Sequence, residues 1–145
     1  MTQEDKMLLI KDLSARLPYA VTVEHTSGFR GTLHDMTVHH MYNDNDNVYD
    51  AICYTDFFGD EDSIYIEYFK PYLFPMSSMT EEQKREYNSL RDFVPTYHYE
   101  YGDIVEDTEL YDNWGSIDYL IANHFDYRGL IPKGLALDAT GLNIY

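Results

Sequence analysis

The fold class is decided by residues 13–25, which run Leu-Ser-Ala-Arg-Leu-Pro-Tyr-Ala-Val-Thr-Val-Glu-His. Before Pro18 the apolar residues recur at helical spacing, and after it Val21 and Val23 alternate with polar residues as in a strand. Because the residue before a proline is pushed out of the α region, Pro18 ends the helix. This stretch therefore predicts a helix followed directly by β-structure, which indicates an α+β fold.

Upstream of this stretch, the sequence predicts an N-terminal helix that begins after Thr2. Thr2 and Asp5 have the spacing of a capping box in which Asp replaces the usual Glu or Gln. One face at helical spacing is apolar and consists of Met7, Leu9, Ile10, Leu13 and Leu17. The basic residues Lys6, Lys11 and Arg16 are placed on the other faces.

Downstream, the apolar pattern takes a period of two up to about residue 69 and predicts four short strands. Turn-forming residues separate these strands at 27–28, 43–47 and 58–62. Four short strands joined by tight turns predict a small antiparallel sheet or an SH3-like barrel over about 19–69. The N-terminal helix is expected to cover this sheet.

The C-terminal part, residues 76–145, is predicted to be helical with an irregular tail, and to pack on residues 1–75 as one compact domain. The two prolines in 70–75 predict an extended connector without regular structure. Thr80 and Gln83 form a capping box for a helix, and Ser116 is expected to cap another over about 117–124. Between these helices we expect a strand at 94–101 and an acidic loop at 102–114.

Two stretches are distinctive as strings, KPYLFPMSSMTEEQK at 70–84 and HFDYRGLIPKGLAL at 124–137. Together with the opening at 1–18, they resemble a family of small phage- and prophage-associated proteins of gut anaerobes to which no activity is assigned. The resemblance implies a genomic context of phage or mobile-element type. It carries over no functional residue, cofactor or reaction.

The charge of the chain restricts its partners. The 145 residues include 26 acidic and 10 basic ones, which gives a formal net charge of −16. Nucleic-acid backbones and anionic membrane surfaces are therefore excluded as direct partners, because binding them requires clustered Lys and Arg. No basic region precedes an apolar run at the N-terminus, no membrane-spanning apolar segment occurs, and Cys53 is the single cysteine, so we expect a cytoplasmic protein.

The acids concentrate in two stretches without a local counter-charge. Residues 31–69 contain nine acids and no Lys or Arg, and residues 92–127 contain nine more and again no Lys or Arg. Tyrosines are interleaved with them, and Tyr is enriched at protein interfaces. We expect a protein partner with a basic surface, bound through Asp44, Asp46, Asp50, Asp60, Glu61, Asp62, Tyr97, Tyr99, Tyr101, Asp103, Glu106, Asp107 and Glu109. The alternative interpretation is that the acids only keep a protein with an aromatic-rich core soluble.

Motifs for metal binding or catalysis are weak. His39 and His40 are adjacent, so on a strand they face opposite ways and do not share an ion. An EF-hand starting at Asp44 would need Gly at 49 and Glu at 55, where the sequence has Tyr49 and Thr55. Cys53 lies in an apolar strand without a nearby cation, which predicts a buried, inert thiol. We therefore expect no metal, no cofactor and no catalytic residues.

These observations favour a non-enzymatic acidic binding protein of phage or mobile-element type. A sharper version is an inhibitor that mimics nucleic-acid charge and blocks a basic host defence protein. Two other classes stay open. One is a small enzyme or ligand-binding protein whose site brings together His34, His39, His98 or His124 with carboxylates. The other is a virion or assembly component that forms a homo-oligomer.

Overall fold

The computed structural model describes residues 1–43, 46–56 and 62–145, and for 40–43 and 46–47 it describes the backbone alone. The chain divides into two compact units, residues 1–78 with 124–145 and residues 79–123. The mixed α+β class is confirmed, since an N-terminal helix is followed by sheets and then by a further helix. The division differs from the one expected at residue 75, because the second unit ends at residue 123 and residues 124–145 belong to the first unit.

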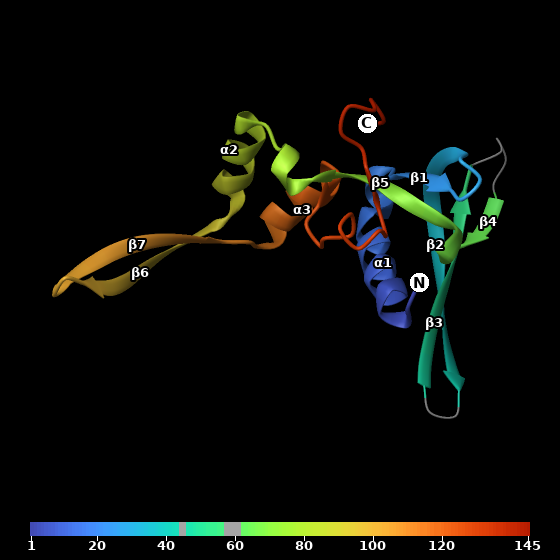
Figure 1. Ribbon diagram of the computed structural model, residues 1–145, viewed down its shortest axis with the longest axis horizontal. Helices are drawn as coiled ribbons and strands as arrows, with labels where there is room; N and C mark the ends of the chain where they lie inside the picture. The colour runs from blue at the N-terminus through green and yellow to red at the C-terminus, as the bar shows by residue number, and fades with distance from the viewer. Residues whose placement is uncertain (44–45, 57–61) are drawn as a thin grey trace. The chain divides into compact units, whose positions relative to one another are not determined.

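The first unit is built on one sheet in which β5 is the junction (Figure 1). Its strands are β1 (Thr22–His25), β2 (Arg30–Asn43), β3 (Asp46–Thr55), β4 (Asp62–Tyr65), β5 (Phe69–Pro75), β8 (Phe125–Asp126) and β9 (Leu137–Asp138). The order is β4-β3-β2-β1-β5-β8, with β9 also paired to β5. Over the described residues this path has two ends, so it is an open sheet and not the SH3-like barrel that was the other expectation.

The expectation of an irregular connector at 70–75 is wrong, because β5 pairs on both sides. Val23 of β1 lies opposite Pro71 in antiparallel register, and Tyr72 lies beside Leu137 in parallel register. A proline removes one donor from a strand, yet the remaining residues of the strand can still pair. The parallel partners come from the segment expected to be an irregular tail, which is how residues 124–145 join the first unit.

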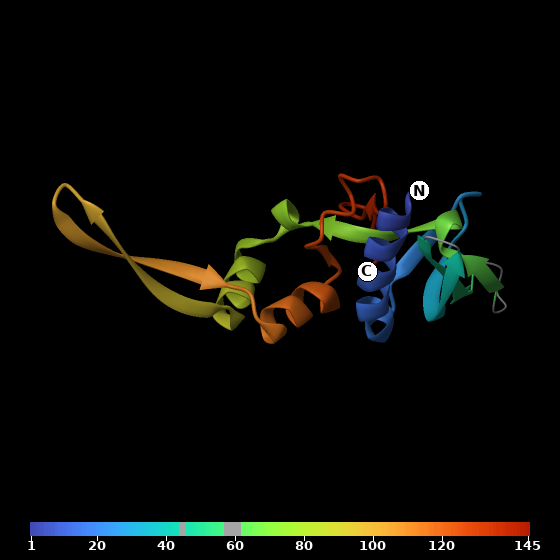
Figure 2. The same cartoon turned by 90° about the horizontal axis from the view of Figure 1, so that it is seen from below.

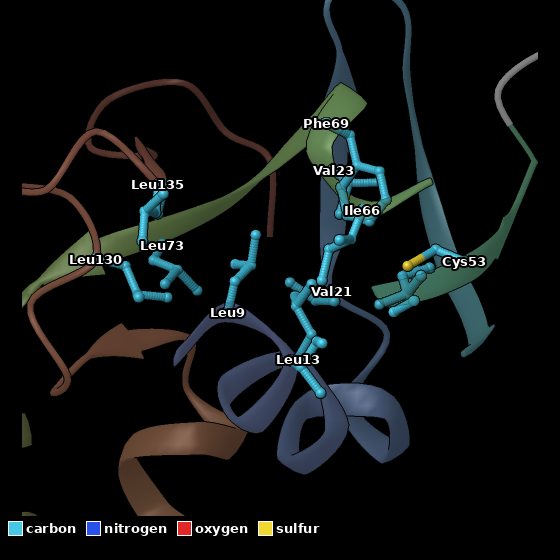
Figure 3. Close-up of a cluster of buried hydrophobic side chains, with 14 residues drawn as sticks. Leu9, Leu13, Val21, Val23, Cys53, Ile66, Phe69, Leu73, Leu130 and Leu135 are labelled. Carbon is cyan, nitrogen blue, oxygen red and sulfur yellow. The ribbon is translucent and has the colours of Figure 1, made fainter. Parts of the chain in front are cut away.

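The core of the first unit lies between α1 (Gln3–Arg16) and the sheet (Figure 3). Leu9 and Leu13 of α1 pack in one cluster with Val23 of β1, Leu73 of β5 and Val21, which directly precedes β1. Leu130 and Leu135 of the C-terminal segment pack in the same cluster. Figures 1 and 2 show α1 beside β5. The Thr2–Asp5 capping box predicted for α1 is present, and η1 (Leu17–Tyr19) follows the helix at Pro18.

Arg16 contradicts its expected position on an outer face of α1, because its side chain is fully buried. Its Nε donates to Asp12 Oδ2 at 2.7 Å and its Nη2 donates to Asp12 Oδ1 at 3.1 Å. The same Nη2 donates to the carbonyl oxygen of Phe125 at 2.7 Å, which links α1 to β8. This ion pair and its hydrogen bonds offset the cost of burying the Arg16 charge. The hydropathy pattern of the helix cannot predict such a pairing.

Tyr145 is tied to the sheet by its hydroxyl, which donates to the carbonyl of Tyr72 at 2.7 Å and accepts from the amide of Thr22 at 3.0 Å. Its ring stacks on His124 with centroids 3.5 Å apart and an interplanar angle of 9°. Burial of the imidazole, together with the charge of Arg16, lowers the pKa of His124 to about 4. The neutral form of His124 is therefore the form that the folded state holds near neutral pH.

We expect the first unit to lose stability as the pH falls from 6.5 towards 4. In this range the unfolded chain binds a proton at His124 that the folded chain does not, so the free energy of unfolding rises with pH. The contribution of this ring is about 1–2 kcal/mol once its partial exposure is allowed for. Urea denaturation at several pH values measures it, and a His124→Gln variant should show a flatter pH dependence over the same range. Equal slopes in the two proteins would contradict this assignment.

The second unit contains two helices and a long hairpin. Its elements are α2 (Glu81–Leu90), β6 (Asp92–Glu100), β7 (Asp103–Tyr111) and α3 (Trp114–Ala122). The predicted capping box of Thr80 and Gln83 is present on α2. The helix expected from 117 instead begins at Trp114, because Asn113 is the capping residue: its side chain accepts from the amide of Ser116, and the Ser116 hydroxyl accepts from the amide of Asn113.

Two other expectations for residues 76–145 need correction. The acidic loop expected at 102–114 is mostly β7, and it pairs with β6 along its whole length. The C-terminal part is also less helical than expected, since a single short helix, α3, follows the hairpin. Figures 1 and 2 show the two paired strands extending from α2 and α3 within this unit.

Candidate functional site

The candidate site is the hairpin of β6 and β7, closed by a two-residue turn. Tyr101 and Gly102 connect Glu100 to Asp103, and both have positive φ, 52° and 85°. A two-residue turn with both central residues at positive φ is the type I′ geometry, which matches the twist of the flanking strands. Tyr101 is 99% exposed, so the turn presents a tyrosine ring to solvent.

The register of the hairpin separates its side chains into an aromatic face and an acidic face. Directly opposed residues share a face, so Tyr99 lies with Ile104, Tyr97 with Glu106, and Phe93 with Leu110. The aromatic face therefore carries Phe93, Tyr97, Tyr99, Ile104 and Leu110, alongside Pro95, Thr108 and one acid, Glu106. The acidic face carries Asp92, Glu100, Asp103, Asp107 and Glu109, alongside Val94, Thr96, His98, Val105 and Tyr111.

The aromatic face is open to solvent despite its composition. Phe93 and Tyr97 are each 66% exposed, Tyr99 is 80% exposed and Ile104 is 66% exposed. Monomeric proteins seldom leave several large apolar side chains together in water, and such a patch marks an interaction surface. A two-stranded sheet by itself is also only marginally stable, so a binding partner would stabilise it.

The base of the hairpin is held by a polar network of Tyr87 on α2 with Arg91 and Asp112, which lie just outside the two strands and the helices. The Arg91 guanidinium donates to the carbonyl of Leu110 at 2.8 Å and lies 3.4 Å from the carboxylate of Asp112. The Tyr87 hydroxyl donates to the same carboxylate, and the Arg91 guanidinium lies over the Tyr87 ring at 5.1 Å. Burial and the Asp112 contact raise the pKa of Tyr87 to about 12. These contacts fix where the strands leave the helices.

Trp114 is a further exposed aromatic residue that the sequence interpretation missed. It is the first residue of α3, directly after β7, and its side chain is 94% exposed. It lines a surface hollow of about 440 Å³ with Asp112, Asn113 and Ile117. Trp is among the residues most enriched in binding hot spots. The indication in the sequence is that the single Trp directly follows Asn113, a residue type that caps helices. The first residue of a helix is seldom part of a hydrophobic core.

The residues predicted from the sequence to bind a partner fall into three groups. Seven lie on the hairpin: Tyr97, Tyr99, Glu106, Tyr101, Asp103, Asp107 and Glu109. Asp50 and Asp62 lie on β3 and β4 of the first unit, and Asp50 is 3.6 Å from the Lys6 ammonium. Asp44, Asp60, Glu61 and the side chain of Asp46 lie outside the described residues.

The two base-free acidic stretches belong to different units, except at one position. Residues 31–69 are in the first unit and 92–123 are in the second, whereas Asp126 returns to the first. Asp126 is 6% exposed and accepts from the amides of Leu130 and Ile131 at 2.8 Å each. This acid therefore orders the C-terminal segment and does not contribute to a binding surface.

The four histidines considered for a catalytic or ligand site lie in separate surroundings. His34 is 3.6 Å from Asp56, and His98 is 3.6 Å from Glu100 on the hairpin. His124 is stacked on Tyr145, while His39 lines a pocket on the first unit. Within the described part of the chain, no group of three or more His, Cys, Asp or Glu is arranged to hold a metal. Cys53 is buried as predicted, and its burial raises its pKa to about 12.

Comparisons with known proteins give no match: no protein family, no curated protein and no solved structure matches this chain. Among the helices over the described residues, none combines the length and apolar character needed to cross a membrane.

Proposed function

We propose that this chain is a non-enzymatic binding protein that contacts a protein with a basic surface through the β6–β7 hairpin. The observation that carries the proposal is the exposed aromatic face, backed on the same two strands by an acidic face. The two faces provide different parts of the interaction. Aromatic rings supply buried contact area, and carboxylates speed the encounter with a positively charged surface.

The charge of the hairpin supports a basic partner in particular. No Lys or Arg occurs between Arg91 and Arg128, so the carboxylates from Glu100 to Glu109 have no Lys or Arg next to them in the sequence. Glu106 lies on the aromatic face itself and would be buried without a partner by a purely apolar surface. A partner that places Lys or Arg near Glu106 and along the acidic face would pair with the carboxylates of both faces.

The sharper form of the proposal is inhibition of a host defence protein by imitation of nucleic-acid charge, in keeping with the phage-like resemblance. Asp107 and Glu109 are two positions apart on one face of β7, so their carboxylates form a row along the strand. A surface that binds phosphates would meet this row as a line of negative charges. Competition between this chain and a DNA duplex for the partner is the expected consequence.

The test begins with a pull-down from host lysate at rising salt and continues with affinity measurements on each basic protein recovered. We expect Tyr97→Ala and Tyr99→Ala each to weaken binding about ten-fold or more, since exposed aromatic residues dominate interface energies. Leu142→Ala, a change of a 45% exposed side chain in the first unit, is the matched control and should leave the affinity unchanged. Circular dichroism of each variant confirms that the hairpin variants remain folded.

Charge variants separate the roles of the two faces. Asp107→Asn with Glu109→Gln should reduce the association rate and its salt dependence, whereas Glu4→Gln on α1 should change neither by a comparable amount. Retention of the partner by Tyr97→Ala at the wild-type affinity would contradict the proposal. Light scattering gives a second contradiction: a stable homo-oligomer that Tyr97→Ala dissociates would favour the assembly-component class instead.

A further inference from the structure

A second feature lies on the first unit, on the face of the sheet that points away from the core. His39 of β2 is directly opposite Asp50 of β3, and Tyr65 of β4 is directly opposite Ile52. Along β3, Ala51 and Cys53 alternate with Asp50 and Ile52, and both are fully buried on the other face. After β4 the chain forms η2 (Ile66–Tyr68), which raises Glu67 and Tyr68 at the edge of this outer face.

Together these side chains line a pocket of about 410 Å³, made by His39, Asp50, Ile52, Tyr65, Glu67 and Tyr68. The lining combines the apolar side chain of Ile52 with two tyrosines, Tyr65 and Tyr68, which are 49% and 46% exposed. The lining contains two carboxylates and no Lys or Arg. Asp50 is already 3.6 Å from the Lys6 ammonium, so Glu67 is the carboxylate with charge to offer a ligand.

This combination suits an organic cation better than a metal ion. A metal requires several oxygen or nitrogen ligands at once, and among the described residues no group of three or more His, Cys, Asp or Glu is placed to supply them. A guanidinium or alkylammonium group instead binds over the face of an aromatic ring, with a carboxylate completing its charge. Its aliphatic stem would lie on Ile52, as cationic side chains do on apolar surfaces.

We infer that the pocket between β3, β4 and η2 binds a guanidinium or alkylammonium group. Glu67 neutralises the charge, the rings of Tyr65 and Tyr68 bind its faces, and Ile52 contacts the stem. The group could be an Arg or Lys side chain of a protein or a free small amine, since both have the same chemistry. The inference stands apart from the hairpin and does not depend on the proposed function.

The test is a titration of the ¹⁵N-labelled protein followed by NMR. A tripeptide with blocked ends, Gly-Arg-Gly, is compared with Gly-citrulline-Gly, which has nearly the same shape and no charge, and with ethylguanidinium. The arginine peptide and ethylguanidinium should both shift the amides of residues 64–68, and the citrulline peptide should not. Tighter binding of the peptide assigns the site to a protein side chain, and tighter binding of ethylguanidinium assigns it to a small amine.

Variants decide whether the pocket itself is responsible. Glu67→Gln and Tyr68→Leu should each weaken the binding of ethylguanidinium about three-fold or more, from loss of the carboxylate or of one ring. Glu82→Gln removes the same charge from an exposed position on α2 and should leave the affinity unchanged. Equal affinity in all these proteins would mean a general attraction to a chain of net charge −16 and would overturn the inference. Equal shifts from the citrulline peptide would overturn it too.

Discussion

Asp12→Ala is expected to lower the free energy of unfolding of the first unit by about 3–5 kcal/mol, the cost of leaving a buried charge without its partner. In the native protein the side chains of Arg16 and Asp12 are 0% and 1% exposed and share two hydrogen bonds. Arg128 lies 3.6 Å from the same carboxylate. Removal of the Asp12 carboxylate therefore leaves two guanidinium groups, those of Arg16 and Arg128, without their counter-charge. Urea denaturation followed by circular dichroism measures the loss.

Two controls distinguish a lost ion pair from general damage to α1. Lys11→Ala changes an exposed charge on the same helix and should alter stability by no more than about 0.5 kcal/mol. The double variant Asp12→Leu with Arg16→Met replaces the pair by apolar side chains and should recover much of the loss, because buried ion pairs are seldom better than good apolar packing. An Asp12→Ala loss below about 1 kcal/mol would show that water reaches the Arg16 guanidinium.

Leu73→Ala is expected to destabilise the first unit by about 2–5 kcal/mol, from lost burial and from the cavity left behind. Leu73 is fully buried on β5 and lies in the cluster with Leu9, Leu130 and Leu135 (Figure 3). Because β5 pairs with β1, β8 and β9, this side chain joins α1, the sheet and the C-terminal segment in one core. In urea denaturation of Leu73→Ala, the unfolding transition of the first unit should therefore move to lower urea as a single step.

The comparison for this prediction uses two leucine changes of different cost. Leu73→Met keeps most of the volume and should cost less than about 1.5 kcal/mol. Leu142→Ala shortens an exposed leucine of the same unit and should be nearly neutral. If Leu73→Ala were as mild as Leu142→Ala, the C-terminal segment would not share a core with α1.

The hairpin shows why part of the candidate site was predictable. The alternation of Tyr97, Tyr99 and their neighbours predicted a strand, and β6 is present. The sequence predicts a loop where β7 lies, because Glu106 and Thr108 separate Ile104 from Leu110 on the same face of the strand. A strand with polar residues on both sides has no apolar period to detect, and only pairing across the turn at Gly102 reveals which residues share a face.

The sequence by itself determined the features that depend on residues a few positions apart. The capping boxes at Thr2 and Thr80, the end of the first helix at Pro18, the buried state of Cys53 and the uneven charge are all of this kind. Their energies come from local hydrogen bonds, backbone sterics and composition, which a single chain segment already contains.

Tertiary structure alone decided which distant segments meet. It paired β5 with β8 and β9, buried Arg16 against Phe125, and divided the hairpin into an aromatic and an acidic face. Each of these depends on contacts between residues that are far apart in the chain or on opposite strands, and their local sequence is compatible with other partners. The physical reason is that burial and strand register are properties of the pair of segments, and neither segment specifies them alone.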